Sequence, residues 1–329
     1  MKFEKKLNII LIAFMVFIFP FTYHIHYHIL YLLEKHKVEN IEKEHVVVFY
    51  DDFDTEHGNI IIQAFSNELN STLDKYEIIK FNQKDVRVEV LEPLVLDLLN
   101  DGKQVYFNSS VIPPTGDSSF VWNSTYKHFL KYENMTLTQS VGNNLDTAEY
   151  LKTFTDQNQD MDNEIYTLLN DRAEEIKAIA LSEDIDNLLK EYNYLGLRLA
   201  AIKSKIGFDR NDEMRALISK TISPIIVKYQ LEKEQNKIID MYSSIINSFS
   251  FAILITNTNK NVIQVGASVQ ADIDRGNTSF IDFRIKNLVN IDVRENPIIY
   301  IDGEKQMGTS ISSPVALANI MNQSNTINQ

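Results

Sequence analysis

The feature that most limits the folds open to this chain is a continuous run of β-branched and aromatic residues at positions 45–50, His-Val-Val-Val-Phe-Tyr. A strand without polar alternation suits a parallel sheet that is covered on both faces. The run ends at Asp51 and Asp52, and His57 then opens a segment, residues 59–73, whose apolar residues follow helical spacing. Because strand, short loop and helix form the first unit of an α/β layer, we predict an α/β fold with a parallel sheet flanked by helices.

Strand and helix patterns continue to alternate along the chain, with one interruption. The expected elements are a helix at 94–99, a strand at 104–107, a helix at 126–132, strands at 135–139, 251–256, 262–267 and 298–301, and a helix at 310–321. Between residues 146 and 250 helical periodicity dominates. We therefore predict one α/β domain, made of residues 45–145 and 251–329, with an inserted all-α region at 146–250.

Two apolar stripes at helical spacing support helices within this insertion. The first stripe consists of Ile185, Leu188, Leu189, Tyr192, Leu195, Leu199 and Ile202, and the second of Ile238, Met241, Tyr242, Ile245 and Phe249. Such stripes usually bury one helix against another, which favours core packing inside the insertion. Docking of a protein partner on the insertion is the second interpretation.

The amino terminus has the sequence of a membrane segment. Lys2, Lys5 and Lys6 precede an uncharged apolar run of about 17 residues at 7–23, close to the shortest length that crosses a bilayer. Residues 19–24 are bulky and aromatic, whereas a signal-peptide cleavage site needs small residues. We therefore predict an uncleaved anchor, with the lysines in the cytoplasm and the rest of the chain outside. A cleaved signal on a secreted protein is the alternative.

Residues 1–33 are accordingly assigned to the anchor or signal, and the charged residues 34–44 to a linker. Four histidines follow the apolar run, namely His24, His26, His28 and His36. A His-x-His-x-His run can bind a metal ion on a strand. The interleaved tyrosines favour instead an interfacial belt where the anchor leaves the membrane; they are Tyr23, Tyr27 and Tyr31.

The charge balance and the lack of cysteine exclude several functions. Lys and Arg number 32 against 45 Asp and Glu, a formal net charge of −13, so a nucleic-acid backbone is not expected as a partner. There is no cysteine, which excludes disulfides, thiolate zinc sites and a cysteine nucleophile. No acidic loop has calcium-site spacing, and we expect neither a metal nor a cofactor.

Residues 308–314, Gly-Thr-Ser-Ile-Ser-Ser-Pro, are the segment with the clearest chemistry. A glycine turn lets the backbone approach a substrate, and Ser310 at a helix start would lie among free backbone amides. Those amides and the helix dipole stabilise an oxyanion beside the serine. We expect Pro314 to be tolerated because it lies in the first turn, where amide donors are not needed. The alternative is an ordinary serine-capped helix.

Residues 308–314 resemble the serine motif of the subtilases, the subtilisin-like serine proteases, whose pattern is Gly-Thr-Ser-x-[Ala/Ser]-x-Pro. Other segments resemble the family's remaining motifs in the family's order. They are the strand 46–50 ending at Asp51, His57-Gly58, the cleft strand 104–110 with its Asn-x-Ser end, Ser-Val-Gly-Asn at 140–143, and Asn-Val-Ile-Gln-Val-Gly-Ala at 261–267. The resemblance covers about 45–145 and 251–321 and implies a subtilisin-like sheet.

The resemblance implies a serine endopeptidase that hydrolyses protein or peptide substrates through an acyl-enzyme intermediate. Ser310 would attack the peptide carbonyl. His57 would take the serine proton and pass it to the leaving amine, while Asp51 would orient the imidazole. The side-chain amide of Asn143 and the backbone amide of Ser310 would hold the oxyanion.

The chain departs from the usual pattern at the acid. A typical subtilase separates its aspartate and histidine by tens of residues, whereas Asp51 and His57 are six apart. Shortened members with an Asp-Asp-Phe…His-Gly arrangement look similar to residues 51–58. The shortening leaves Asp52 as an alternative catalytic acid, while Asp54 is expected to be solvated.

The oxyanion residue and the activity itself also have alternatives. Asn257 or Asn259 follows the expected strand 251–256 and could replace Asn143, although Gly142 favours Asn143. A catalytically inactive subtilase fold that binds a partner through its helical insertion is the competing function. A lipase-like hydrolase is not favoured, because the chain has no Gly-x-Ser-x-Gly elbow after a strand.

Overall fold

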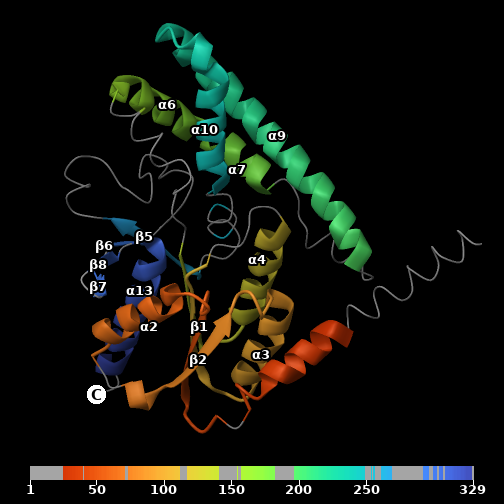
Figure 1. Ribbon diagram of the computed structural model, residues 1–329, viewed down its shortest axis with the longest axis vertical. Helices are drawn as coiled ribbons and strands as arrows, with labels where there is room; N and C mark the ends of the chain where they lie inside the picture. The colour runs from red at the N-terminus through yellow and green to blue at the C-terminus, as the bar shows by residue number, and fades with distance from the viewer. Residues whose placement is uncertain are drawn as a thin grey trace, which may run out of the picture.

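The structure is a computed structural model of the 329-residue chain. It describes residues 25–39, 41–70, 73–111, 117–140, 154, 157–181, 196–248, 253, 255, 261–268, 292–295, 299–301, 304–306 and 308–327. The described residues form an α/β part and a helical part (Figure 1).

Six strands form one parallel sheet in the order β2-β1-β3-β4-β5-β6. Their bounds are β1 His45–Asp51, β2 Glu77–Asn82, β3 Gln104–Ser109, β4 Met135–Ser140, β5 Ile263–Ser268 and β6 Asp292–Glu295. Two short strands, β7 (Ile299–Ile301) and β8 (Glu304–Gln306), form a separate antiparallel hairpin. The predicted α/β class, with a parallel sheet flanked by helices, is confirmed.

Helices cover both faces of this sheet, which explains the unbroken apolar run in β1. Val46 and Val48 pack in the same core as α3 (Val88–Asn100) and α4 (Asp117–Phe129). Val47 and Phe49 point the other way, into a core shared with α2 (Glu56–Glu68) and α13 (Thr309–Ile327). Alternate side chains of β1 therefore enter two different cores, and neither set reaches solvent. The helices on each face can be followed in Figure 1.

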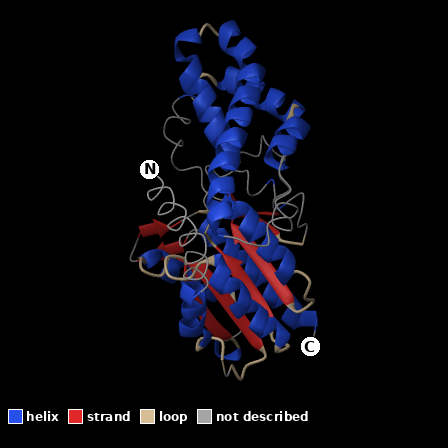
Figure 2. Cartoon of the chain, turned by 90° about the vertical axis from the view of Figure 1, so that its right-hand side faces the viewer, coloured by secondary structure: helices blue, strands red, loops and turns tan. Residues whose placement is uncertain are grey.

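The helical part has a core of its own. The helical part consists of α6 (Gln159–Asp171), α7 (Ala173–Leu181), α9 (Gly196–Lys228) and α10 (Gln235–Ser248), and the one-turn 3₁₀ segment Glu232–Glu234 precedes α10. A second 3₁₀ segment, Leu73–Lys75, belongs to the α/β part and precedes β2. Figure 2 shows the helices of the helical part extending away from the strands. The stripe residues Ile238, Met241, Tyr242 and Ile245 are buried in this core. That burial matches core packing, and most of the other stripe, from 185 to 195, lies outside the described residues.

Some predicted elements are wrong or were missed. In the expected strand 251–256, Ile253 and Ile255 are helical and buried, and the other residues are not described. A short apolar run cannot distinguish a buried helix from a buried strand, which explains the error. β2 and β6 were not predicted, because their charged residues break the strand pattern. The first helix begins at Glu56 and ends at Glu68, earlier than the predicted 59–73.

The predicted anchor, residues 7–23, lies outside the described residues. Within the described part of the chain, no helix is long and apolar enough to cross a membrane. Residues 25–35 are helical, and Tyr27 and Tyr31 pack against the core of α3 and α4. These two tyrosines therefore face the domain, contrary to the predicted interfacial belt.

Candidate active site

The candidate site lies at the carboxyl edge of the sheet, between β1 and β3. From β1 the chain crosses to β2 on one side, and from β2 it returns to β3 on the other side of β1. In open α/β sheets, ligands bind at such a reversal of strand order, outside the carboxyl ends of the strands. Asp51 is the last residue of β1, and Ser109 is the last residue of β3. Polar residues therefore follow both strands at the position where this fold binds substrates.

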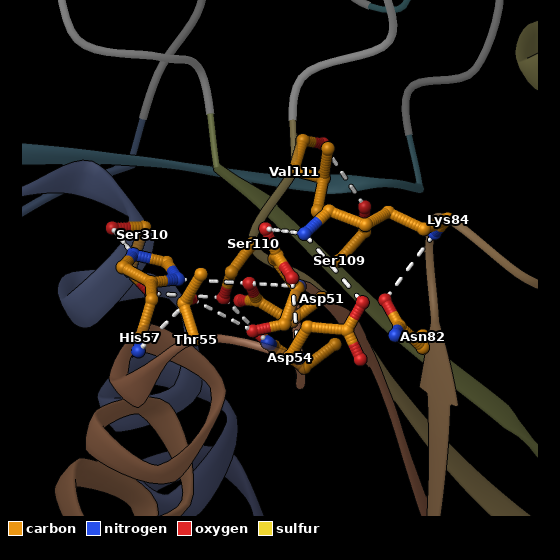
Figure 3. Close-up of polar contacts among 12 residues, drawn as sticks. Asp51, Asp54, Thr55, His57, Asn82, Lys84, Ser109, Ser110, Val111 and Ser310 are labelled. Atoms are coloured by element: carbon orange, nitrogen blue, oxygen red, sulfur yellow. Dashed lines mark hydrogen bonds and ion pairs between the residues drawn. The ribbon is translucent and has the colours of Figure 1, made fainter.

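Three of the predicted site residues meet there in one hydrogen-bonded line (Figure 3). The Nδ1 atom of His57 lies 2.8 Å from Oδ1 of Asp51. Its Nε2 atom lies 3.0 Å from the hydroxyl oxygen of Ser310, which is 253 residues further along the chain. The imidazole thus contacts a carboxylate through one nitrogen and a hydroxyl through the other. This is the arrangement in which a serine can be deprotonated.

The two candidate acids have different partners. Asp51 is 1% exposed, and its Oδ1 also accepts a hydrogen bond of 2.5 Å from the backbone amide of Asp52. The Asp52 carboxylate instead forms an ion pair of 3.1 Å with Lys84, which also lies 3.5 Å from Asp54. The structure therefore places Asp51 against His57, and it places Asp52 and Asp54 against a lysine.

Asp51 and His57 can be close in sequence because the loop between them is tightly bonded. Thr55 caps α2, since its hydroxyl accepts from the His57 amide at 3.3 Å and donates to the Asp52 carbonyl at 3.2 Å. The Gly58 amide donates to the same carbonyl at 3.2 Å. A Cβ atom on Gly58 would lie 2.4 Å from the Phe53 ring, so only glycine lets this ring close the loop.

The surroundings of His57 favour its protonated form. The hydrogen bond to Asp51 raises the pKa of His57 above its ordinary 6.5, and the charges of Asp51 and Asp52 add to this effect. Partial burial acts in the opposite direction. A general base with a raised pKa takes a proton readily but is neutral only at higher pH.

Ser310 stands in the first turn of α13. Gly308 precedes the helix with φ of +153°, which side chains rarely adopt, and its carbonyl accepts from the amides of Ile311 and Ser312 at 3.1 and 3.0 Å. Amides at a helix start have no intrahelical acceptor and can bind an anion. The expectation for Pro314 was wrong: it is the sixth residue of α13, beyond the first turn.

The polar residues at the end of β3 have contacts that the sequence did not predict. Asn108 is fully buried and bonds Ser110, Thr138 and Ser313, while the Ser110 hydroxyl bonds the backbone of Ser310. The Asn-x-Ser pattern at this strand end was the signal that could have revealed them.

The other site predictions fall outside the described residues or find no support there. Asn143, Asn257 and Asn259 are all in undescribed segments, so the choice of oxyanion residue stays a prediction. His26 and His28 are exposed, and two positions apart on a helix they point in different directions. No group of three or more His, Asp or Glu residues able to hold a metal ion occurs among the described residues.

Comparisons of the chain with protein-family models, with curated proteins and with solved structures give no match. An assignment of function therefore depends on the contacts of the site's own residues.

Proposed function

We propose that the protein is a serine endopeptidase with a subtilisin-like arrangement of its fold and site. One observation carries the proposal: His57 lies 2.8 Å from the Asp51 carboxylate and 3.0 Å from the Ser310 hydroxyl. The chain order of the three residues, aspartate, histidine, serine, is the subtilase order. Their position at the carboxyl edge of a parallel sheet also agrees with this proposal.

In the proposed reaction, Ser310 attacks the carbonyl carbon of a peptide bond while its proton passes to Nε2 of His57. The tetrahedral intermediate collapses, the C–N bond breaks, and His57 returns the proton to the leaving amine. Water then attacks the acyl-enzyme with His57 again as the base. Asp51 stabilises the imidazolium throughout, and its burial keeps water from competing for that contact.

The developing oxyanion needs hydrogen-bond donors. The backbone amide of Ser310 lies in the first turn of α13, where amides are free and the helix dipole is positive. We propose the side-chain amide of Asn143 as the second donor, with Asn257 as the alternative. Loss of one such donor lowers turnover about 10²–10³-fold.

We also propose that the protein acts at a membrane surface, outside the cytoplasm. Ile25, Ile29, Leu32 and Leu33 form one exposed stripe of the helix at 25–35, each between 44% and 60% exposed. They are four of the five exposed large apolar side chains in the described part of the chain, and they follow directly on the apolar run 7–23.

Because the chain has no cysteine, a fluorescent dye attached to Leu32→Cys can test this location in phosphatidylcholine vesicles. Spin-labelled lipid is expected to quench the fluorescence of the dye at Leu32→Cys. It should not quench the same dye at Asp101→Cys, an exposed position after α3.

The activity is tested by labelling the full-length protein with a fluorescent fluorophosphonate. Wild-type protein should be labelled, and Ser310→Ala should not. Ser66→Ala is the matched control. Ser66 is also a helical serine, and its hydroxyl donates to the carbonyl of Ile62 in the same helix. Equal labelling of Ser310→Ala, or a folded wild type that is not labelled, would contradict the proposal. The latter would favour the inactive binding module.

A further inference from the structure

The carbonyl group of Ser310 lacks its usual helical partner. In an α-helix each carbonyl accepts from the amide four residues later, which for Ser310 is residue 314. That residue is Pro314, which has no amide hydrogen. Ser310 is buried, and a buried carbonyl without a donor is unfavourable. Another group must therefore bond this carbonyl.

The hydroxyl of Ser110 supplies the bond from the sheet. Its Oγ donates to the Ser310 carbonyl oxygen at 2.8 Å, and Ser110 is itself only 6% exposed (Figure 3). Ser110 directly follows β3, the strand beside the one that ends in Asp51. The backbone of Ser310 is thus bonded to the same sheet edge that carries the acid.

Asn108 directs this hydrogen bond. Ser110 has one hydroxyl hydrogen, and Nδ2 of Asn108 donates to its oxygen at 2.8 Å, which leaves that hydrogen for Ser310. The amide oxygen of Asn108 accepts from Thr138 at 3.1 Å and from Ser313 at 2.7 Å. A reversed amide would present its oxygen to Ser110 and draw the hydroxyl hydrogen away from Ser310.

We propose that Ser110 and Asn108 are positioning residues for the catalytic serine, and that Pro314 makes this possible by leaving the Ser310 carbonyl free. The inference rests on the proposed function, because positioning matters only if Ser310 reacts. It adds that the backbone carbonyl of Ser310 is held by a hydrogen bond from Ser110 at the end of β3, which replaces the hydrogen bond that the amide of residue 314 would donate within α13. The 3.0 Å contact between the Ser310 hydroxyl and His57 depends on this hydrogen bond from Ser110.

The first test is the rate of fluorophosphonate labelling of the full-length protein at several probe concentrations. Ser110→Ala should lower the maximal labelling rate about 10–100-fold, because displacements near 1 Å have effects of this size. The probe concentration at half-maximal rate should change less than about twofold, since the binding surface is kept. Ser243→Ala is the matched control: Ser243 is 5% exposed, close to the 6% of Ser110, but it lies on α10 in the helical part. It should keep the wild-type rate.

A second variant separates positioning from general stability. Ser110→Ala leaves a buried carbonyl without its donor, so its melting temperature should fall by about 2–10 °C. Adding Pro314→Ala gives the Ser310 carbonyl a helical donor again. The double variant should regain melting temperature while its labelling stays slow, because Ser310 is no longer bonded to β3. Recovery of both together would overturn the positioning role.

The two proposals fail in different ways. If the wild type is labelled and Ser110→Ala is labelled at the same rate, the positioning role is overturned and the proposed function stands. If the folded wild type is not labelled at all, both are overturned.

Discussion

The two parts of the molecule differ in where they bury polar residues. In the helical part, the buried polar residues among those described are few and scattered: Asp162, Thr221 and Ser243. In the α/β part most of them gather at one sheet edge and at the start of α13: Asp51, Asn108, Ser109, Ser110, Thr138, Gln139, Ser140, Thr309, Ser310, Ser312 and Ser313; the others are Asn123 and Thr125 on α4 and Gln264 on β5. Buried polar groups destabilise a fold unless each is bonded. Their concentration at one edge supports the reaction proposed there, whereas the buried residues described in the helical part are mostly apolar.

The largest expected effect compares the same substitution in the two parts. Asp51→Asn should lower the labelling rate by roughly 10⁴-fold, because an amide cannot stabilise the imidazolium and favours the wrong tautomer. Asp162→Asn, where a buried acid accepts from Tyr242, should leave the labelling rate unchanged and lower only the melting temperature. Fluorophosphonate kinetics and thermal unfolding on both variants measure this. Similar rate losses in the two would remove the contrast between the parts.

The next effect concerns the loop that joins the acid to the base. Gly58→Ala should lower the labelling rate by about 10²-fold, because the new Cβ would overlap the Phe53 ring and shift His57. Asn59→Ala is the control, as Asn59 is the exposed neighbour on α2. Phe53→Leu added to Gly58→Ala should recover part of the rate. A Gly58→Ala protein with normal kinetics would show that the loop does not hold the histidine.

A substitution in the helical core should affect folding alone. Ile238→Ala removes a fully buried side chain and should lower the free energy of unfolding by about 2–5 kcal/mol. The labelling rate of the protein that remains folded should stay within about twofold. Urea unfolding and labelling in buffer measure the two quantities. A large loss of rate without unfolding would mean that the helical part takes part in catalysis.

The smallest effect is a shift in pH dependence. Labelling needs neutral His57, so the rate should rise as pH increases through the raised pKa of His57. Asp52→Asn removes one negative charge that favours the imidazolium, so it should lower the pKa and move this rise to lower pH. The rate on the high-pH plateau should stay within a few-fold of wild type. Asp54→Asn, at an exposed carboxylate, should leave the profile in place.

The same pKa has a consequence for stability. Since folding raises the pKa of His57 above 6.5, its bond to Asp51 contributes most to stability below pH 6.5. That contribution is lost as pH rises through the folded-state pKa. The proposed reaction, which needs neutral His57, would therefore run in the pH range where this contribution to stability is declining.

The sequence was most informative where one pattern admits one structure. The β-branched and aromatic run 45–50 favoured a strand buried on both faces, the spacing around Leu94 and Ile238 favoured helices, and the structure has these elements. The meeting of Asp51, His57 and Ser310 was expected from the family's motif order, and the structure places them in contact. Motif order gives no distances, so the choice between Asp51 and Asp52 needed the contact with Lys84.

Other features could not be read from the sequence because they depend on distant partners. β2 is an edge strand that pairs only with β1, and its side chains are less buried than those of a central strand. Its lysine and glutamate interrupt the apolar pattern, so the sequence did not predict a strand there. The role of Pro314 was misjudged because, even in a helix that starts at residue 310 as predicted, it is the fifth residue and lies beyond the amides that have no helical acceptor. Asn108 was predicted only as part of the Asn-x-Ser end of the cleft strand 104–110, and its contacts could not be predicted because its partners Thr138 and Ser313 lie 30 and 205 residues away.

The separation of the triad along the chain also has a consequence for biosynthesis. Asp51 and His57 leave the ribosome almost together, but Ser310 follows 253 residues after His57. Until α13 is made and packs against α2 and the sheet, the nascent chain holds an acid and a base without a nucleophile. For the proposed endopeptidase, the order of synthesis would delay activity until nearly all of the described fold exists, which would protect the translating cell from a prematurely active site.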